Sequence, residues 1–137
     1  MLVSDIMTKN VITATTSCSA AEASRLLHVH NIGALPVVDT QGNLRGIITD
    51  RDIVTRCVAT EADPATTPLR ELMTRRVTTV SPDDAVDEAS AAMATRQIRR
   101  LPVVDHGKLV GMLALADMAV EGRAEEALNA VSRPNAF

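Results

Sequence analysis

The chain has 137 residues, a formal net charge of −3 and a sequence isoelectric point near 5.5, and 46% of its residues are hydrophobic. This length and apolar content suffice for a globular core, whereas the small negative charge provides no general attraction to nucleic acid or acidic membranes. The sequence has no Trp or Tyr and a single Phe, which argues against a nucleic-acid surface built on aromatic stacking.

The sequence beginning at Met1 lacks the basic head and apolar stretch of a signal peptide, and its longest apolar run, residues 109–116, is too short to cross a membrane. We therefore expect a cytoplasmic protein that does not bind membranes. Cys18 and Cys57 are far apart and form no C-x-x-C motif, so we expect reduced, half-buried side chains.

Changes in apolar periodicity predict that the chain begins with a strand followed by a helix. Residues 11–14 are predicted to form the strand. Ser19 and Glu22 have the spacing of a capping box, which predicts a helix that ends near residues 31–33. Its buried face should carry Ala23, Leu26 and Leu27.

Two strands and a second helix are predicted next. Residues 34–39 and 44–48 should pair around a turn, with Pro36 at a position where its missing N–H breaks no ladder bond. The second helix is predicted to start after Thr49. Its predicted buried residues are Ile53, Val54 and Val58.

The same order of elements is predicted again further along the chain. The ranges are a strand at 77–80, a helix at 84–96, a turn at 106–107, a strand at 108–113 and a helix from about 116. Thr67–Pro68 resembles a helix cap with Pro in the first turn. We therefore predict a first repeat at 1–60, a linker at 61–66, a second repeat at 67–122, and a helical extension and tail at 123–137.

An internal repeat supports this division. Leu35-Pro36-Val37-Val38-Asp39 returns as Leu101-Pro102-Val103-Val104-Asp105. Pairing residues 4–40 with 70–106, and 42–54 with 107–119, gives 17 identities in 50 pairs. Each copy is short for an independent domain, so we expect one compact α/β unit with pseudo-twofold symmetry.

The segment from Gly46 to Asp52 has the most specific pattern for ligand chemistry. A hydroxyl at Thr49, between a strand and a helix, lies beside free helical N–H groups, an arrangement that favours a phosphate or sugar oxygen. A carboxylate three residues later can accept hydrogen bonds from two neighbouring hydroxyls, such as those of a ribose. The alternative is that Thr49 is only a helix cap and Asp52 only an acid at the favourable end of the helix dipole.

Taken together, the paired motifs resemble a tandem of cystathionine-β-synthase-type (CBS) domains over roughly residues 3–121. The resemblance rests on Met7-Thr8 and Met73-Thr74, the two Leu-Pro-Val-Val-Asp segments, and the two turns that contain Asp52 and Asp117. It implies two βαββα units packed through their sheets, with clefts that often hold AMP, ADP, ATP or S-adenosylmethionine. It also implies a homodimer, and no required cofactor.

The resemblance also implies roles for individual residues. Asp52 and Asp117 match the family's ribose-binding acids, and Thr49 matches its hydroxyl contact, whereas Ala114 in the second copy lacks a hydroxyl. The adenine-facing walls match strands that include Val11, Thr13, Val77 and Thr79 on one side, and Ala34, Pro36, Arg100 and Pro102 on the other.

A basic group at Arg96, Arg99 and Arg100 precedes the second Leu-Pro motif, where the first copy has His30, Gly33 and Ala34. One reading is that these arginines, together with Arg51, close over the phosphates of a ligand, because guanidinium matches phosphate geometry. The other reading is a solvated helix end with cations near the negative end of the dipole.

These patterns favour a regulatory module that binds an adenosine-containing nucleotide and signals to a separate, unidentified partner protein. The alternative is a ligand-free structural dimer. We expect no enzyme, because no nucleophile-and-base pattern or phosphate-binding Walker loop occurs. Metal or redox sensing through His28, His30, Cys18 and Cys57 is a minor alternative, and we expect no metal site because residues two apart on a helix do not share a face.

Overall fold

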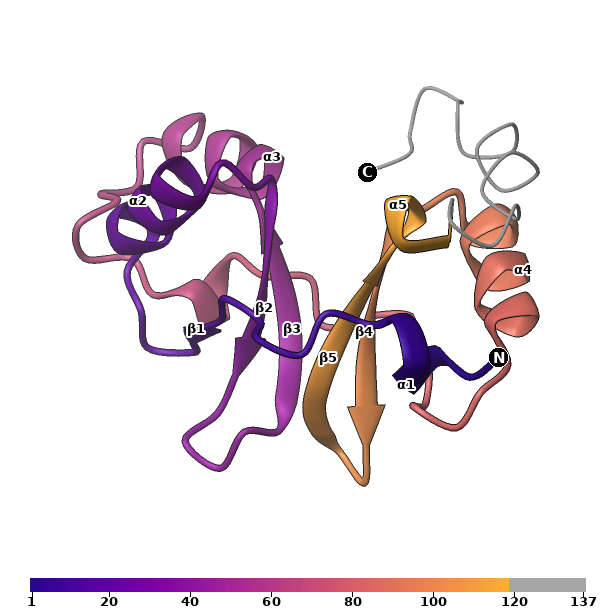
Figure 1. Ribbon diagram of the computed structural model, residues 1–137. Helices are drawn as coiled ribbons and strands as arrows, with labels where there is room; N and C mark the ends of the chain where they lie inside the picture. Colours follow the sequence, from indigo (N-terminus) through magenta and orange to yellow (C-terminus); the bar gives the residue numbers. More distant parts are fainter. Residues whose placement is uncertain (119–137) are drawn as a thin grey trace. The chain divides into compact units, whose positions relative to one another are not determined.

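The computed structural model describes residues 1–118, which form two compact units (Figure 1). The central unit contains residues 12–77. The terminal unit contains residues 1–11 and the chain from residue 78 onward. Strands and helices occur in both units, which confirms the predicted α/β class. No helix within the described residues is both long and apolar enough to span a membrane.

The central unit is a three-stranded sheet with helices. Its elements are β1 (Ala14–Thr15), α2 (Ala20–His30), β2 (Ala34–Val38), β3 (Leu44–Thr49), α3 (Asp50–Ile53), the π-helix η1 (Val54–Val58) and the 3₁₀ helix η2 (Leu69–Glu71). β1 is parallel to β2, which is antiparallel to β3. Ser19 caps α2 by accepting a hydrogen bond from the Glu22 N–H at 3.2 Å, which confirms the predicted start of this helix.

The terminal unit has a similar plan around a hairpin. Its elements are α1 (Val3–Ile6), α4 (Val86–Arg96), β4 (Arg100–Asp105), β5 (Lys108–Ala114) and α5 (Leu115–Met118). β4 and β5 are antiparallel. Val80 forms a single parallel bridge with Val103, at the position where Ala14 pairs with Val37 in the central unit.

The outer edge of each hairpin is paired with a short segment from elsewhere in the sequence. In the central unit, Ile47 and Thr74 exchange two backbone hydrogen bonds of 2.9 Å. In the terminal unit, Met112 and Thr8 do the same at 2.8 and 2.9 Å. Because Ile47 directs its N–H and C=O toward Thr74, its cross-strand neighbour Pro36 loses no bond to β3, as predicted.

A glycine on each hairpin permits this close approach. A Cβ atom on Gly46 would lie 2.6 Å from the Thr74 carbonyl oxygen and 2.9 Å from the Met73 sulfur. A Cβ atom on Gly111 would lie 2.7 Å from the Met7 sulfur and 2.9 Å from the Thr8 carbonyl oxygen. The Met-Thr pair near the start of each sequence repeat therefore packs on the hairpin of the other repeat, so the compact units do not follow the predicted repeat boundaries.

Three details differ from the sequence predictions. The strands predicted at 11–14 and 77–80 shorten to β1 and to the single bridge at Val80, because the other residues of these ranges find no ladder partner. Pro68 is the cap of η2, rather than a first-turn residue of an α-helix. The end of the second repeat and the predicted extension at 123–137 lie outside the described residues.

The largest difference in the core concerns the helix after β3. Ile53 is buried as predicted, but the exposed fractions of Val54 and Val58 are 57% and 56%. Cys57 is fully buried instead. Cys57 follows Ile53 by four residues and therefore shares its face of the helix, whereas Val54 is the next residue after Ile53 and lies about 100° further around the axis. The chain also changes from α- to π-helix at Val54.

We predict that Gly46→Ala destabilises the protein by about 1–3 kcal/mol, because the new methyl group would meet a backbone oxygen that holds the sheet edge. Urea unfolding followed by circular dichroism measures this change. Gly33→Ala is the matched control, since its Cβ would lie 3.8 Å from the nearest atom, an Asp50 carboxylate oxygen. Equal stabilities of the two variants would contradict the proposed role of the Met-Thr contact.

Candidate functional site

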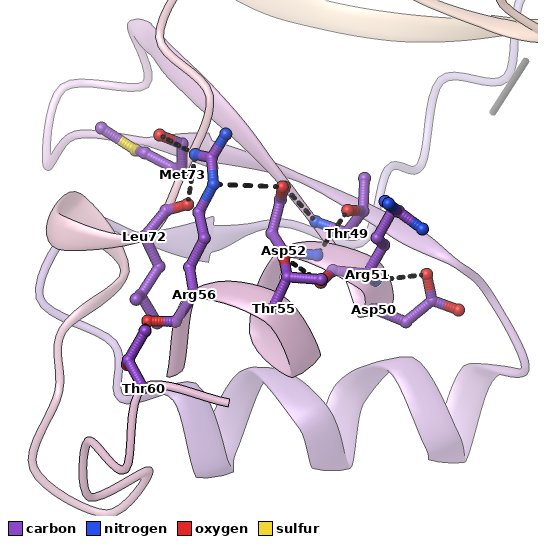
Figure 2. A network of polar contacts seen from close by, with 9 residues as sticks. All are labelled: Thr49, Asp50, Arg51, Asp52, Thr55, Arg56, Thr60, Leu72 and Met73. Carbon is purple, nitrogen blue, oxygen red and sulfur yellow. Dashed lines mark hydrogen bonds and ion pairs between the residues drawn. The ribbon is translucent and has the colours of Figure 1, made fainter. Parts of the chain in front are cut away.

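The turn between β3 and α3 is organised by reciprocal hydrogen bonds between Thr49 and Asp52 (Figure 2). The Thr49 Oγ1 accepts from the Asp52 N–H at 3.0 Å. The Asp52 Oδ2 accepts from the Thr49 N–H at 3.1 Å. Both residues therefore cap α3, as the structural reading of this motif predicts.

The turn between β5 and α5 keeps half of this arrangement. The Asp117 Oδ2 accepts from the Ala114 N–H at 2.8 Å. Ala114 has no hydroxyl to return the bond. Because the same backbone N–H holds a carboxylate in both turns, the second acid is positioned without help from a Thr side chain.

Within residues 1–118, the hydrogen bonds to each carboxylate leave acceptor positions unused. A carboxylate offers about four lone-pair positions. For Asp52, whose side chain is only 13% exposed, one position takes the Thr49 N–H, and Oδ1 lies 3.8 Å from Arg56 Nε. The remaining capacity suits a group that presents two neighbouring hydroxyls.

The two turns have the same backbone frame but different side chains. The Asp50 N–H donates to the Gly33 carbonyl at 3.1 Å, and the Leu115 N–H donates to the Arg99 carbonyl at 2.8 Å. Cross-strand partners also correspond. Ala34 lies opposite Thr49, and Arg100 lies opposite Ala114. The central turn is therefore bordered by two small residues, and the terminal turn by two arginines.

The other predicted site residues are distributed over the two units. Arg51 is exposed beside Asp50, whose Oδ1 accepts the Arg51 backbone N–H at 2.8 Å. Pro36 and Pro102 are buried in β2 and β4. Thr13 and Val77 belong to the central unit, and Val11 and Thr79 to the terminal unit.

Arg56 also lies at the candidate site, although the sequence did not predict it. Its Nη1 donates to the Leu72 carbonyl at 3.0 Å and to the Met73 carbonyl at 3.5 Å, while Nε faces Asp52 (Figure 2). The i,i+4 spacing of Asp52 and Arg56 could have indicated the ion pair. The bonds to residues 72 and 73 have no sequence signal.

The metal and redox alternative gains no support within residues 1–118. His28 and His30 are exposed in the last turn of α2, and no group of three or more His, Cys, Asp or Glu side chains in this range could hold a metal ion. Cys18 and Cys57 are free thiols. Burial raises the pKa of the Cys18 thiol, and the nearby Glu22 carboxylate raises it further, which disfavours the reactive thiolate.

Comparisons with known proteins identify the repeat. The family model described as "CBS domain" matches residues 3–59 and 69–121. The chain is 42% identical over 137 residues to the CBS domain-containing protein YhcV of Bacillus subtilis (strain 168), an alignment that covers 97% of this chain and 96% of that protein.

Solved structures give the same result. The CBS domain pair of protein MJ0100, in complex with 5′-methylthioadenosine and S-adenosyl-L-methionine, matches with a TM-score of 0.77 and 36% identity, covering 91% of this chain and 98% of that one. Hypoxic Response Protein I, with two coordinated zinc ions, matches with a TM-score of 0.81 and 32% identity, covering 88% of this chain and 98% of that one.

We predict opposite stability changes from exchanging the cap residues of the two turns. Thr49→Ala should lower the free energy of unfolding by about 0.5–2 kcal/mol, because the Asp52 N–H loses its acceptor. Ala114→Thr should raise it by up to about 1 kcal/mol by supplying the missing hydroxyl. Urea unfolding measures both, and a destabilising Ala114→Thr would show that the turns are not equivalent.

Proposed function

Because the chain belongs to the CBS domain family, we propose that it is a regulatory module that binds an adenosine-containing ligand and signals to a separate partner protein. The main support comes from the two equivalent turns. In each turn, a backbone N–H holds the carboxylate of Asp52 or Asp117, and the hydrogen bonds among residues 1–118 leave acceptor positions on that carboxylate free. A ribose offers two adjacent hydroxyls to such a carboxylate. The bound ligands of the MJ0100 domain pair, 5′-methylthioadenosine and S-adenosylmethionine, support this ligand class.

In this proposal, each turn contributes the ribose contacts and the neighbouring strands contribute the adenine walls. Asp52 and Asp117 accept the ribose hydroxyls, and Thr49 contacts ribose or phosphate. The backbone around Val11, Thr13, Val77 and Thr79 forms one set of adenine contacts, and the opposite set comes from Ala34, Pro36, Arg100 and Pro102. The candidate ligands are AMP, ADP, ATP and S-adenosylmethionine, and neither catalysis nor a required cofactor is part of the function.

The arginines of the terminal turn favour a ligand with phosphates there. Arg99 and Arg100 occupy the positions held by Gly33 and Ala34 in the central turn. Guanidinium groups bind phosphate oxygens in pairs of hydrogen bonds, so charge differentiates the two turns. At the central turn, Arg51 is an exposed cation next to Asp50.

A homodimer without a ligand is the second candidate function, and the exposed apolar residues of η1 favour it. Val54 and Val58 are both more than half exposed on one short helix. Exposed apolar side chains near one another often mark an interface. A purely structural dimer predicts no stabilisation by any adenosine compound, whereas a ligand that binds only the folded state must raise the melting temperature.

We predict that Asp52→Asn weakens binding of 5′-methylthioadenosine by roughly 10–150-fold at the central turn, the loss expected when hydrogen bonds to a charged group are removed. Asn keeps an oxygen for the Thr49 N–H, so the cap survives. Isothermal titration calorimetry measures the affinity. Asp50→Asn is the matched control, because this exposed neighbour accepts only a local N–H in the same turn. Unchanged affinity in Asp52→Asn would remove this residue from the site.

We predict that Arg99→Ala combined with Arg100→Ala reduces affinity for ATP by about 5–30-fold and leaves affinity for 5′-methylthioadenosine within about twofold, because only ATP presents phosphates. Competition calorimetry compares the two ligands. Arg76→Ala, an exposed arginine of the central unit, is the control. An equal loss for both ligands would indicate a general structural effect instead of phosphate recognition.

A further inference from the structure

Arg56 lies between the acid of the central turn and a separate backbone segment. Nη1 donates to the carbonyl groups of Leu72 and Met73, directly after η2, while Nε faces Asp52 Oδ1 (Figure 2). Carbonyl groups at a helix end lack intrahelical partners. Arg56 donates a hydrogen bond to the Leu72 carbonyl and a longer one to the Met73 carbonyl. These bonds connect η1 with residues 69–74.

The distances show that the backbone holds the guanidinium group more tightly than Asp52 does. The shorter carbonyl bond is 3.0 Å, whereas Nε and Oδ1 are 3.8 Å apart, which is too long for a hydrogen bond. Oδ1 therefore keeps its acceptor positions while a cation stands beside it. When a ligand covers the largely buried carboxylate and removes water, this cation offsets the cost of desolvating the charge.

Residues 69–74 are in turn fixed to the rest of the central unit. The Leu69 N–H donates to the Cys18 carbonyl at 2.8 Å, and Thr74 pairs with Ile47. The segment then leads to residue 78, where the chain enters the terminal unit. In the sequence, the residue four positions after Asp117 is Glu121, so the i,i+4 spacing of Asp52 and Arg56 does not recur in the second repeat.

We propose that Arg56 is a positioning residue that prepares Asp52 for a ligand and couples occupancy of the central turn to the attachment of residues 69–74. This inference rests on the proposed function. Coupling of this kind is reciprocal. A ligand that strengthens the contact between Asp52 and Arg56 stabilises the segment, and loosening the segment weakens the ligand.

The test uses the full chain with Asp117→Asn, which isolates the central turn, and 5′-methylthioadenosine as the probe. Arg56→Ala should weaken binding about 5–30-fold in calorimetry, and Arg56→Lys should recover part of this loss because it keeps the charge. Amide hydrogen exchange should show ligand-induced protection of residues 69–74 with Arg56 present and none in Arg56→Ala.

Arg45→Ala is the matched control, since Arg45 is a similarly exposed arginine paired with an acid, Asp39, in the β2–β3 hairpin. It should change neither readout. Near-normal affinity in Arg56→Ala, or ligand-induced protection that persists in this variant, would overturn the inference even if the apo protein is less stable. If the protein with Arg56 intact binds no adenosine compound, the proposed function itself is wrong. This result differs from one in which the protein binds the ligand but Arg56 has no effect, which contradicts only the inference about Arg56.

Discussion

The contact between a Met-Thr pair and a hairpin glycine determines how this chain is assembled. In each unit, the Thr backbone completes the sheet edge and the Met sulfur lies against the glycine, where no side chain fits. Each Met-Thr pair lies near the start of one repeat in the sequence and pairs with the hairpin of the other. The chain therefore begins in the terminal unit, continues through the central unit and ends in the terminal unit. As a result, each hairpin pairs at its edge with a Thr from the other repeat.

This assembly relates the candidate site to the connecting segment. The strand that receives Thr74 ends at Thr49, whose N–H holds the Asp52 carboxylate. The segment that supplies Thr74 also supplies the carbonyl groups bound by Arg56. A change at the central turn can thus reach the connecting chain through few contacts. For a ligand to act as a signal, it must bind one arrangement of these contacts more tightly than the other.

Short sequence motifs predicted the features that depend on neighbouring residues, namely the Ser19 cap, the two hairpins and the Thr49 cap. They failed where the partner is distant in sequence and where the wrong face of a helix was assigned to the core. Val54 and Val58 were predicted to be buried, but the core contains Cys57, which lies four residues after Ile53 on the same helix face. The carbonyl partners of Arg56 depend on the path of residues 69–74, which no spacing in the sequence reveals. The family resemblance predicted Asp52 and Asp117 as the ribose-binding acids, and the structure adds the backbone N–H groups that orient their side chains.

The most direct test of an adenosine-binding module is equilibrium dialysis of the protein against AMP, ATP, S-adenosylmethionine and 5′-methylthioadenosine, read at the adenine absorption band. With no Trp or Tyr and one Phe, the protein contributes little absorbance of its own there. At least one compound should accumulate on the protein side and saturate at no more than two molecules per chain. Equal absorbance on both sides for all four compounds at high protein concentration would contradict it and favour the ligand-free dimer.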